Sequence, residues 1–444
     1  MASVTNGTSG PSLPVVFTTQ TPYPLPAQKF FIPASWKRYQ LSQLVNKALG
    51  LPRVVPFDFI VGGEILRGSL AQWIAEKGVG EEETIQIEYI ESVMPPQRMT
   101  ALPHEDWVSS ISCQLPGHFL TGSYDGNVRL FSYSQALLHT APIHTAPITS
   151  ASLVPQPSAS PSESNSTLLV TGSQDLTARL TRITPASEEA ADNGETQVLA
   201  SLHLHTAPVS SVSADSTGAH VLTASWDGII GLWDTIIPEK DETPADPQPA
   251  RQKKRRRLAG AEDAPRRKAP LGVMRSHTAR VSAVHFVGDE KAVSAGFDST
   301  VCVWDVERQL CTHTVTASEK PFLALALQGA AGQTALAGST DRTVTLFDLR
   351  ADATQIASAS FSHAASPAAL AVSPSAGSHQ FVSGGYDGVV RLWDVRSAAK
   401  EMASFKVWEG KEGRKILGVD WKGDVVGIAG EGGVEVWNVA ESRS

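Results

Sequence analysis

The stretch TASWDGIIGLWDT, from Thr223 to Thr235, decides the fold of this 444-residue chain, because related copies of it recur along the sequence. Each copy has an apolar segment, a tight turn around Asp-Gly or its equivalent, and an alternating segment that ends in an aromatic residue or its equivalent. Asp-Gly between two such segments is a strong signal for a β-hairpin. Six clear copies and a weaker seventh begin at Thr121, Thr171, Thr223, Ser294, Ala337, Ser383 and Gly427.

A histidine opens the apolar segment upstream of several turns, 22 residues before Asp227 at His205 and 21 residues before Asp298 at His277. Because the histidines recur once per repeat, they are too dispersed to share one metal ion. His, Asp and Trp in this order resemble the signature of WD repeats. In that family they form a buried hydrogen-bond network that ties together the strands of one blade. The resemblance assigns this network to His205, Asp227, Trp233, His277, Asp298, Trp304, His363, Asp387 and Trp393.

Seven copies predict a mainly β fold built around a seven-bladed WD-repeat β-propeller, with four antiparallel strands in each blade. We expect the propeller over 104–444 with two disordered insertions, 154–167 and 236–270, because both are rich in polar residues and proline. Few residues follow Val439, so the last blade needs an outer strand from elsewhere. The linker 93–103 is expected to supply that strand and to close the ring.

The first hundred residues follow a different pattern. We expect a disordered N-terminus over 1–13 and a small α+β domain over 14–92. Residues 39–49 place apolar side chains at helical spacing and stop before Gly50, which predicts a helix. Strands are expected at 15–20, 30–35, 57–61 and 84–90, and a short helix at 69–76. This order resembles a ubiquitin-like β-grasp domain, and without a terminal Gly-Gly it would serve as a docking module.

The order of the two domains carries a more specific resemblance. A domain of this kind before a seven-bladed propeller resembles WD-repeat ribosome-biogenesis factors with an NLE (Notchless-like) domain, and within them the WD-repeat subunit of the PeBoW complex. The resemblance covers nearly the full length of the chain. It implies a non-catalytic scaffold in large-subunit biogenesis and pre-rRNA processing, in the nucleus, nucleolus and nucleoplasm. The partners it implies are pescadillo, a second and larger WD-repeat assembly factor, the midasin AAA ATPase and the pre-ribosomal large-subunit particle.

The acidic run before the last strand of the N-terminal domain is the candidate docking site. In the family that the chain resembles, a glutamate here completes the coordination of a metal ion held by midasin. The resemblance assigns that role to Glu83, with Glu82 as the second candidate and Glu81 in the same run. An exposed carboxylate is a hard oxygen ligand suited to Mg²⁺. The alternative is a solvated acidic turn without a function of its own.

A block of basic residues in the second insertion stands out against a chain of net charge -8. Residues 236–270 hold ten basic and six acidic residues, a local net charge of +4. A nuclear localisation signal is the leading interpretation, and non-specific RNA contact through phosphate neutralisation is the alternative. No aromatic residue interleaves the cluster, so base stacking is not expected. The basic residues assigned to the signal are Arg251, Lys253, Lys254, Arg255, Arg256, Arg257, Arg266, Arg267 and Lys268.

Several classes of protein are excluded or disfavoured by motif. No stretch of about 18 apolar residues is present, so we expect no membrane span and no membrane partner. The three cysteines Cys113, Cys302 and Cys311 form no C-x-x-C pair, which indicates reduced thiols in a cytosolic or nuclear protein. Phosphate-loop and H-E-x-x-H motifs are missing, so we expect no catalytic residue, no cofactor and no metal of the chain's own.

A substrate receptor of a cullin-RING ubiquitin ligase is the alternative function. Phe347-Asp-Leu-Arg350 and Trp393-Asp-Val-Arg396 match the short W/F-D-x-R motif of such receptors. The motif is weak, because the Trp-Asp part belongs to the folding signature of every repeat.

Overall fold

The computed structural model describes residues 11–51, 53–80, 82–156, 166–184, 194–243, 265–316, 319–329, 332–350, 359–375, 378–410 and 413–439. The described residues divide into two compact units. The first contains those of Met1–Gln97, Arg391–Ser404 and Asn438–Ser444, and the second contains those of Arg98–Val390 and Phe405–Trp437. Strands dominate both units, and none of the helices in the described ranges is both long and apolar enough to cross a membrane.

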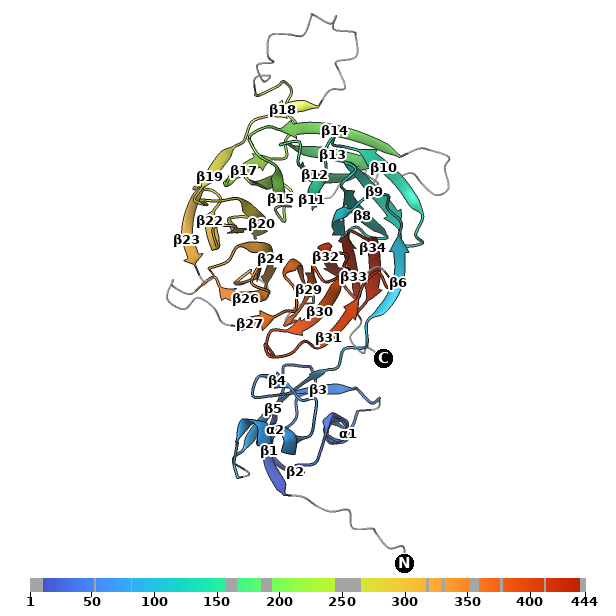
Figure 1. Cartoon of the computed structure of the whole chain (residues 1–444), viewed down its shortest axis with the longest axis vertical. Helices are drawn as coiled ribbons and strands as arrows, with labels where there is room; N and C mark the ends of the chain where they lie inside the picture. Colours follow the sequence, from blue (N-terminus) through green and yellow to red (C-terminus); the bar gives the residue numbers. More distant parts are fainter. Residues whose placement is uncertain are drawn as a thin grey trace, which may run out of the picture. The chain divides into compact units, whose positions relative to one another are not determined.

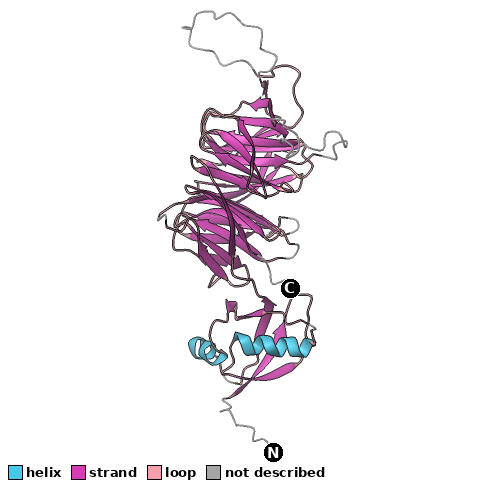
Figure 2. Ribbon diagram, turned by 90° about the vertical axis from the view of Figure 1, so that its right-hand side faces the viewer, coloured by secondary structure: helices cyan, strands magenta, loops and turns pink. Residues whose placement is uncertain are grey.

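The N-terminal part of the first unit is a five-stranded sheet with two helices, in the strand order β2-β1-β5-β3-β4. β1 runs parallel to β5 and antiparallel to β2, whereas β3 and β5 are antiparallel. Figure 2 shows both helices beside this sheet. The elements are β1 (Ser12–Thr18), β2 (Lys29–Pro33), α1 (Arg38–Leu49), β3 (Phe57–Val61), β4 (Glu64–Ile65), α2 (Leu70–Lys77) and β5 (Ile85–Glu91).

These elements form where the sequence pattern predicts them, apart from the two-residue strand β4, which the pattern did not predict. Alternation in β1 and β5 buries one side of each strand, and α1 covers that side with Leu41 and Val45. Gly50 ends α1 in the left-handed conformation, with φ of 62°, and donates its N–H to the Asn46 carbonyl. Ser69 caps α2 by accepting the Gln72 N–H.

Seven further sheets follow within the described ranges, and their inner strands contact one another in cyclic order, so that they form a closed ring (Figure 1). The inner strands are β7 (Val108–Ser112), β11 (Ile148–Val154), β15 (Val209–Ala214), β20 (Val281–Val287), β24 (Phe322–Gln328), β28 (Pro367–Val372) and β32 (Ile416–Lys422). All of them belong to the second unit. The remaining strands of each sheet follow outward from these, and β18 (Arg266–Lys268) pairs in parallel with β14 (Glu195–Leu202).

The second strands of the sheets are β8 (His118–Ser123), β12 (Thr167–Ser173), β16 (His220–Ser225), β21 (Lys291–Gly296), β25 (Thr334–Ser339), β29 (Gln380–Gly385) and β33 (Val425–Gly430). The third strands are β9 (Asn127–Ser132), β13 (Ala178–Thr184), β17 (Ile229–Asp234), β22 (Thr300–Asp305), β26 (Thr343–Asp348), β30 (Val389–Asp394) and β34 (Gly433–Asn438). The outer strands are β10 (Leu137–Pro142), β14 (Glu195–Leu202), β18 (Arg266–Lys268), β19 (Gly272–Arg275), β23 (Leu310–Thr316), β27 (Ala359–Ser362), β31 (Ala403–Lys406) and β6 (Gln97–Leu102).

The repeated turn explains why Asp-Gly recurs. The residue after the turn aspartate has a left-handed backbone, with φ of 82° at Gly126, and a Cβ there would lie 2.3 Å from the His144 carbonyl oxygen. Glycine relieves both constraints. Leu176 and Arg342 occupy the same position in other repeats with φ of 70°, which strains a residue that carries a side chain.

The second insertion is shorter than the predicted range 236–270. Arg266–Lys268 form β18, which pairs in parallel with β14 through Ala200, Ser201 and Leu202. The predicted disorder is therefore wrong at this end, because a strand edge offers backbone partners that composition does not reveal. Residues 244–264, most of 154–167 and 1–10 of the predicted N-terminal tail lie outside the described residues.

Candidate docking sites

The turn before β5 exposes the candidate carboxylates. Glu82, Glu83 and Thr84 are exposed, while Ile85 begins the buried side of β5. The Glu83 N–H donates to the Gly80 carbonyl at 3.1 Å, which holds the turn. In the described part of the chain, the Glu83 carboxylate forms no ion pair or side-chain hydrogen bond. It is therefore available to another molecule, whereas Glu81 lies outside the described residues.

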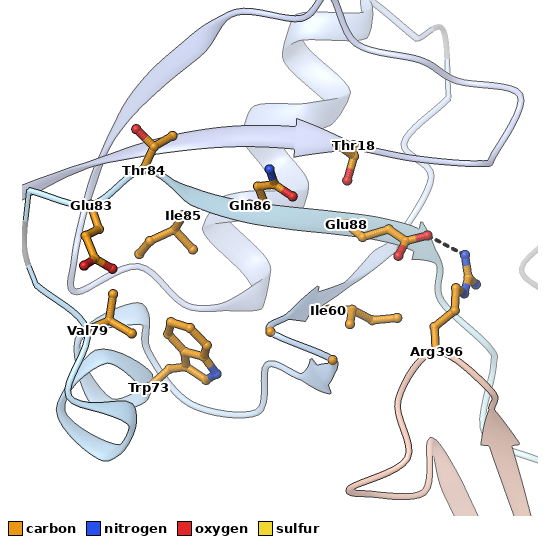
Figure 3. A pocket seen from close by; sticks show the side chains of 12 residues that line it. Thr18, Ile60, Trp73, Val79, Glu83, Thr84, Ile85, Gln86, Glu88 and Arg396 are labelled. Carbon is orange, nitrogen blue, oxygen red and sulfur yellow. Dashed lines mark hydrogen bonds and ion pairs between the residues drawn. The ribbon is translucent and has the colours of Figure 1, made fainter. Parts of the chain in front are cut away.

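Glu83 stands at one end of a pocket of about 420 Å³ (Figure 3). Trp73 of α2 and Val79 line the pocket next to it. Trp73 packs against the β3–β4 turn so closely that a Cβ on Gly62 would lie 2.8 Å from the indole ring. The Trp73 Nε1 is buried without a hydrogen-bond partner among the described residues. An exposed carboxylate beside an aromatic wall gives a partner both a charged and an apolar contact.

The far end of the same pocket contains an ion pair of the first unit. Arg396 Nη1 lies 2.6 Å from Glu88 Oε1, and its Nη2 lies 2.7 Å from Asp394 Oδ2 (Figure 3). Arg350 likewise turns back on Asp348, at 2.9 Å. Both arginines of the W/F-D-x-R matches are thus bound to the aspartate of their own motif, and the Arg396 side chain is only 20% exposed.

The repeat histidines form hydrogen-bond chains that connect neighbouring strands of one sheet. In one chain, Trp233 Nε1–H donates to Thr223 Oγ1 at 2.9 Å, and Thr223 Oγ1 lies 2.8 Å from His205 Nε2. His205 Nδ1 lies 3.2 Å from Asp227 Oδ2. Because a carboxylate only accepts, this contact places the proton on Nδ1 and leaves Nε2 to accept from threonine. The chain thus satisfies every buried polar group along it.

The same geometry recurs in the next sheet with serine in place of threonine. Trp304 Nε1–H donates to Ser294 Oγ at 2.8 Å, His277 Nε2 lies 2.7 Å from that oxygen, and His277 Nδ1 lies 2.8 Å from Asp298. His363 Nε2 lies 2.7 Å from Ser383 Oγ, while Asp387 accepts the Val389 N–H and Trp393 is buried. The hydroxyl that joins tryptophan to histidine was not among the sequence predictions. Its signal was the Thr or Ser four residues before five of the six turn aspartates, with Ala337 at that position before Asp341.

These contacts stabilise the charged carboxylates. Burial alone raises the pKa of Asp175, but hydrogen bonds from His144 and Thr177 outweigh it and lower the pKa to about 2. His144 Nδ1 lies 2.8 Å from Asp175 Oδ2. The pKa of Asp227 is also lowered, because the His205 bond opposes the effect of burial. These aspartates therefore remain ionised at neutral pH and serve the fold.

One face of the ring carries a set of aromatic side chains that sequence analysis did not identify. We call it the aromatic face, and its members are Trp107, Tyr124, Trp226, Phe297 and Tyr386. Four of them come directly before a turn aspartate, and Trp107 pairs with the first of these through its carbonyl. Arg280 lies over the Phe297 ring at 3.3 Å and over the Trp226 ring at 5.3 Å, and Lys415 lies 5.3 Å from the Tyr386 ring centre.

The aromatic face has the composition of a protein-binding surface. Trp107 and Trp226 are each 44% exposed and Tyr386 is 37% exposed. Tryptophan, tyrosine and arginine dominate the energetics of protein interfaces. Their repeated position before the turn aspartate was the signal in the sequence. Only the closed ring brings these aromatic side chains to one face.

The basic block divides into two parts. Arg251, Lys253, Lys254, Arg255, Arg256 and Arg257 lie outside the described residues. The second part is β18, where Lys268 is 2% exposed and its ammonium donates to Asp234 and to the Ile236 carbonyl. Lys268 is thus held inside the fold and is not accessible to an import receptor, which corrects its assignment to the localisation signal.

Comparisons with known proteins agree with this architecture. The NLE (NUC135) domain model matches residues 13–74. The WD domain, G-beta repeat model matches residues 97–132, 196–234, 268–305 and 356–394.

The similarity to curated relatives extends over nearly the whole chain. The chain is 56% identical to the Ribosome biogenesis protein YTM1 of Laccaria bicolor over 443 residues, covering 97% of this chain and 96% of the relative. It is 54% identical to the protein of the same name from Coprinopsis cinerea, over 96% of this chain and 94% of the relative. The protein of that name from Eremothecium gossypii is 33% identical over 83% of this chain and 82% of its own length. The predicted resemblance to WD-repeat ribosome-biogenesis factors is confirmed, and the chain belongs to the YTM1 family of ribosome biogenesis proteins.

Proposed function

We propose that this protein is a scaffold in the biogenesis of the large ribosomal subunit and in pre-rRNA processing, and that it has no catalytic activity of its own. The observation that carries this function is the full-length similarity to relatives named Ribosome biogenesis protein YTM1. We propose a ubiquitin-like domain over 14–92, a linker with a ring-closing strand over 93–103, and a seven-bladed propeller over 104–444. The mixed sheet with its two helices and the closed ring of sheets support this division.

The ubiquitin-like domain docks on a metal ion held by the midasin ATPase, through Glu83. Mg²⁺ requires about six oxygen ligands, and one carboxylate supplies one or two of them. The remaining ligands would come from midasin and from water. Glu83 fits this role because its carboxylate is exposed and has no partner in the described part of the chain. ATP hydrolysis by the partner would then pull this protein from the pre-ribosome.

Substitution of Glu83 tests this docking. Glu83→Ala is expected to abolish co-purification of midasin, because the metal loses a charged ligand. Glu83→Asp is expected to lose most of it, because the carboxylate moves back by about 1.5 Å from a shell that needs contacts of ~2.1 Å. Glu82→Ala is the matched control and is expected to retain binding. Unchanged binding by Glu83→Ala would refute the assignment, and a loss confined to Glu82→Ala would move the role to Glu82.

The propeller binds the partner assembly factors, which we propose to be pescadillo and a second, larger WD-repeat protein. Its aromatic face is the best candidate surface, because Trp107 and Trp226 are exposed and Arg280 lies over the Trp226 ring. A standard interface buries about 800 Å² on each partner. Affinity purification of the tagged protein, followed by mass spectrometry, is expected to recover both factors with large-subunit precursors. Recovery of a cullin adaptor without ribosomal proteins would contradict the scaffold function.

Action on pre-ribosomes requires entry into the nucleus, nucleolus and nucleoplasm. We propose that the basic residues 251–257 carry the localisation signal, with Arg266 and Arg267 contributing from β18. The backbone of Arg267 is held by Asp241 and by Glu242, but its strand lies at the outer edge of a sheet. Non-specific contact of the same residues with RNA phosphates remains compatible with import.

A further inference from the structure

A second pocket, of about 450 Å³, opens within the second unit and shares no residue with the turn at Glu83 or with the aromatic face. Its wall comes from the β15–β16 loop, the β20–β21 loop and the segment after β22. Four carboxylates line it, from Asp215, Asp289, Glu290 and Glu307, and its lining includes no lysine or arginine. Such a pocket attracts cations.

The carboxylate of Asp215 is incompletely satisfied. Asp215 is 1% exposed, and its Oδ2 accepts from Thr217 Oγ1–H at 2.8 Å and lies 3.3 Å from His220 Nδ1. Its Oδ1 is buried and has no hydrogen-bond partner among the described residues. A buried carboxylate oxygen is costly unless a donor reaches it. The pocket therefore contains an acceptor that lacks its donor.

The rest of the pocket suits a long cationic side chain. Glu290 and Glu307 are exposed and form no ion pair in the described ranges, so their field adds to that of Asp215. Leu232, Leu271 and Val306 provide apolar walls. Lysine and arginine bury an aliphatic stem against such walls while their charged end finds an acceptor, and a charge-assisted hydrogen bond is about twice as strong as a neutral one.

We propose that this pocket binds a basic peptide segment of a partner protein by receiving one of its lysine or arginine side chains, whose charged end donates to Asp215 Oδ1. The charge of the lining and the unpartnered oxygen favour this occupant. A divalent cation is the other candidate, although the described residues contain no cluster of three or more His, Cys, Asp or Glu that could hold a metal. The two occupants are separated by the experiment below.

The test measures the affinity of the full-length protein for a fluorescein-labelled (Arg-Gly)₅ peptide by fluorescence anisotropy at physiological salt. Glu307→Gln is expected to weaken binding about threefold, and Asp215→Asn about tenfold or more, because the second removes a charge-assisted bond in a buried place. Asp424→Asn changes the net charge equally at an exposed residue outside this pocket, and it is expected to leave the affinity unchanged. Glu83→Ala is also expected to bind the peptide normally, which separates this site from the midasin docking site.

Three outcomes would overturn the proposal. The first is that the peptide does not bind. The second is that Asp424→Asn and Glu307→Gln weaken binding equally. The third is that Mg²⁺ or Ca²⁺ at low millimolar concentration displaces the peptide, and that binding of this cation depends on Asp215. If Asp215→Asn fails to fold, the double variant Glu290→Gln/Glu307→Gln decides, because both side chains are exposed. About fivefold weaker binding by that variant supports the pocket, and unchanged binding refutes it.

Discussion

At the residue scale, the main polar feature is a hydrogen-bond chain. It runs from tryptophan through a hydroxyl group to histidine and aspartate. It links the third strand of a sheet to the second, and then to the turn aspartate and to the segment that enters the inner strand. Each donor in it is buried, so removal of one member leaves another without a partner. The hydrogen-bond chain therefore ties the strands of one sheet together.

Asp175 makes the pH dependence of these ties measurable. Its folded pKa of about 2 lies below the ordinary value of 3.8, so its stabilising effect is complete above about pH 5 and is lost as the pH falls toward 2. We expect Asp175→Asn to lower the free energy of unfolding by about 2 kcal/mol at pH 7. The part of that difference due to charge is expected to shrink by pH 3. Thermal unfolding of both proteins at the two pH values, with Asp424→Asn as control, measures it, and a difference independent of pH would contradict it.

At the scale of elements, the strand β6 determines how the last sheet is completed. It lies beside β34 although more than three hundred residues separate them in sequence. Leu102 of β6 is 1% exposed. Arg98 lies 3.0 Å from Glu435, whose side chain is only 3% exposed and also accepts from Trp437 Nε1. A strand donated from the start of the chain thus covers an edge and neutralises a buried carboxylate.

Replacement of Gln97–Leu102 by a Gly-Ser segment of the same length is expected to lower the melting temperature by about 5 °C or more. The loss of Leu102 burial and of the partner of Glu435 amounts to several kcal/mol, and ~1 kcal/mol shifts the melting temperature by about 2–4 °C in a domain of this order of size. The matched control places Gly-Ser at 94–96, before the strand, and should melt like the parent protein. Equal melting of both variants would show that β6 does not hold the ring closed.

On the scale of the whole molecule, the chain combines surfaces of different chemistry. The N-terminal unit offers a free carboxylate, the ring offers aromatic side chains and an acidic pocket, and the basic block follows β17 in the sequence. The first part of the basic block, residues 251–257, can be removed without β18.

Deletion of residues 251–257 is therefore expected to abolish nuclear accumulation of a fluorescent fusion while leaving the melting temperature unchanged. The deletion removes six of the basic residues but neither β18 nor the buried contact of Lys268 with Asp234. Deletion of 157–163, seven residues of the Ser/Pro-rich insertion, is the control of equal length and should remain nuclear. Normal nuclear accumulation without 251–257 would contradict the assignment of the signal to that segment.

Local features of this protein were predictable because they depend on neighbours in sequence. The repeated copies predicted the hairpins, since a left-handed residue after the turn aspartate requires Gly126 or a strained substitute. The spacing of Leu41 and Val45 predicted α1, and alternation over 84–90 predicted β5. Each of these depends on a period or on a turn that a few residues determine.

Tertiary structure alone decided the features that join distant segments. Composition predicted disorder for Arg266–Lys268, yet the free edge of β14 supplied partners for a strand. Asp215, Glu290 and Glu307 come from three separate loops, so the acidic pocket exists only when the sheets pack side by side. The sequence by itself determined the repeat and its hairpins, because these depend on residues that are close in sequence. The closure of the ring and the geometry of neighbouring loops determined the sites, because backbone pairing and charge act between residues that only folding brings together.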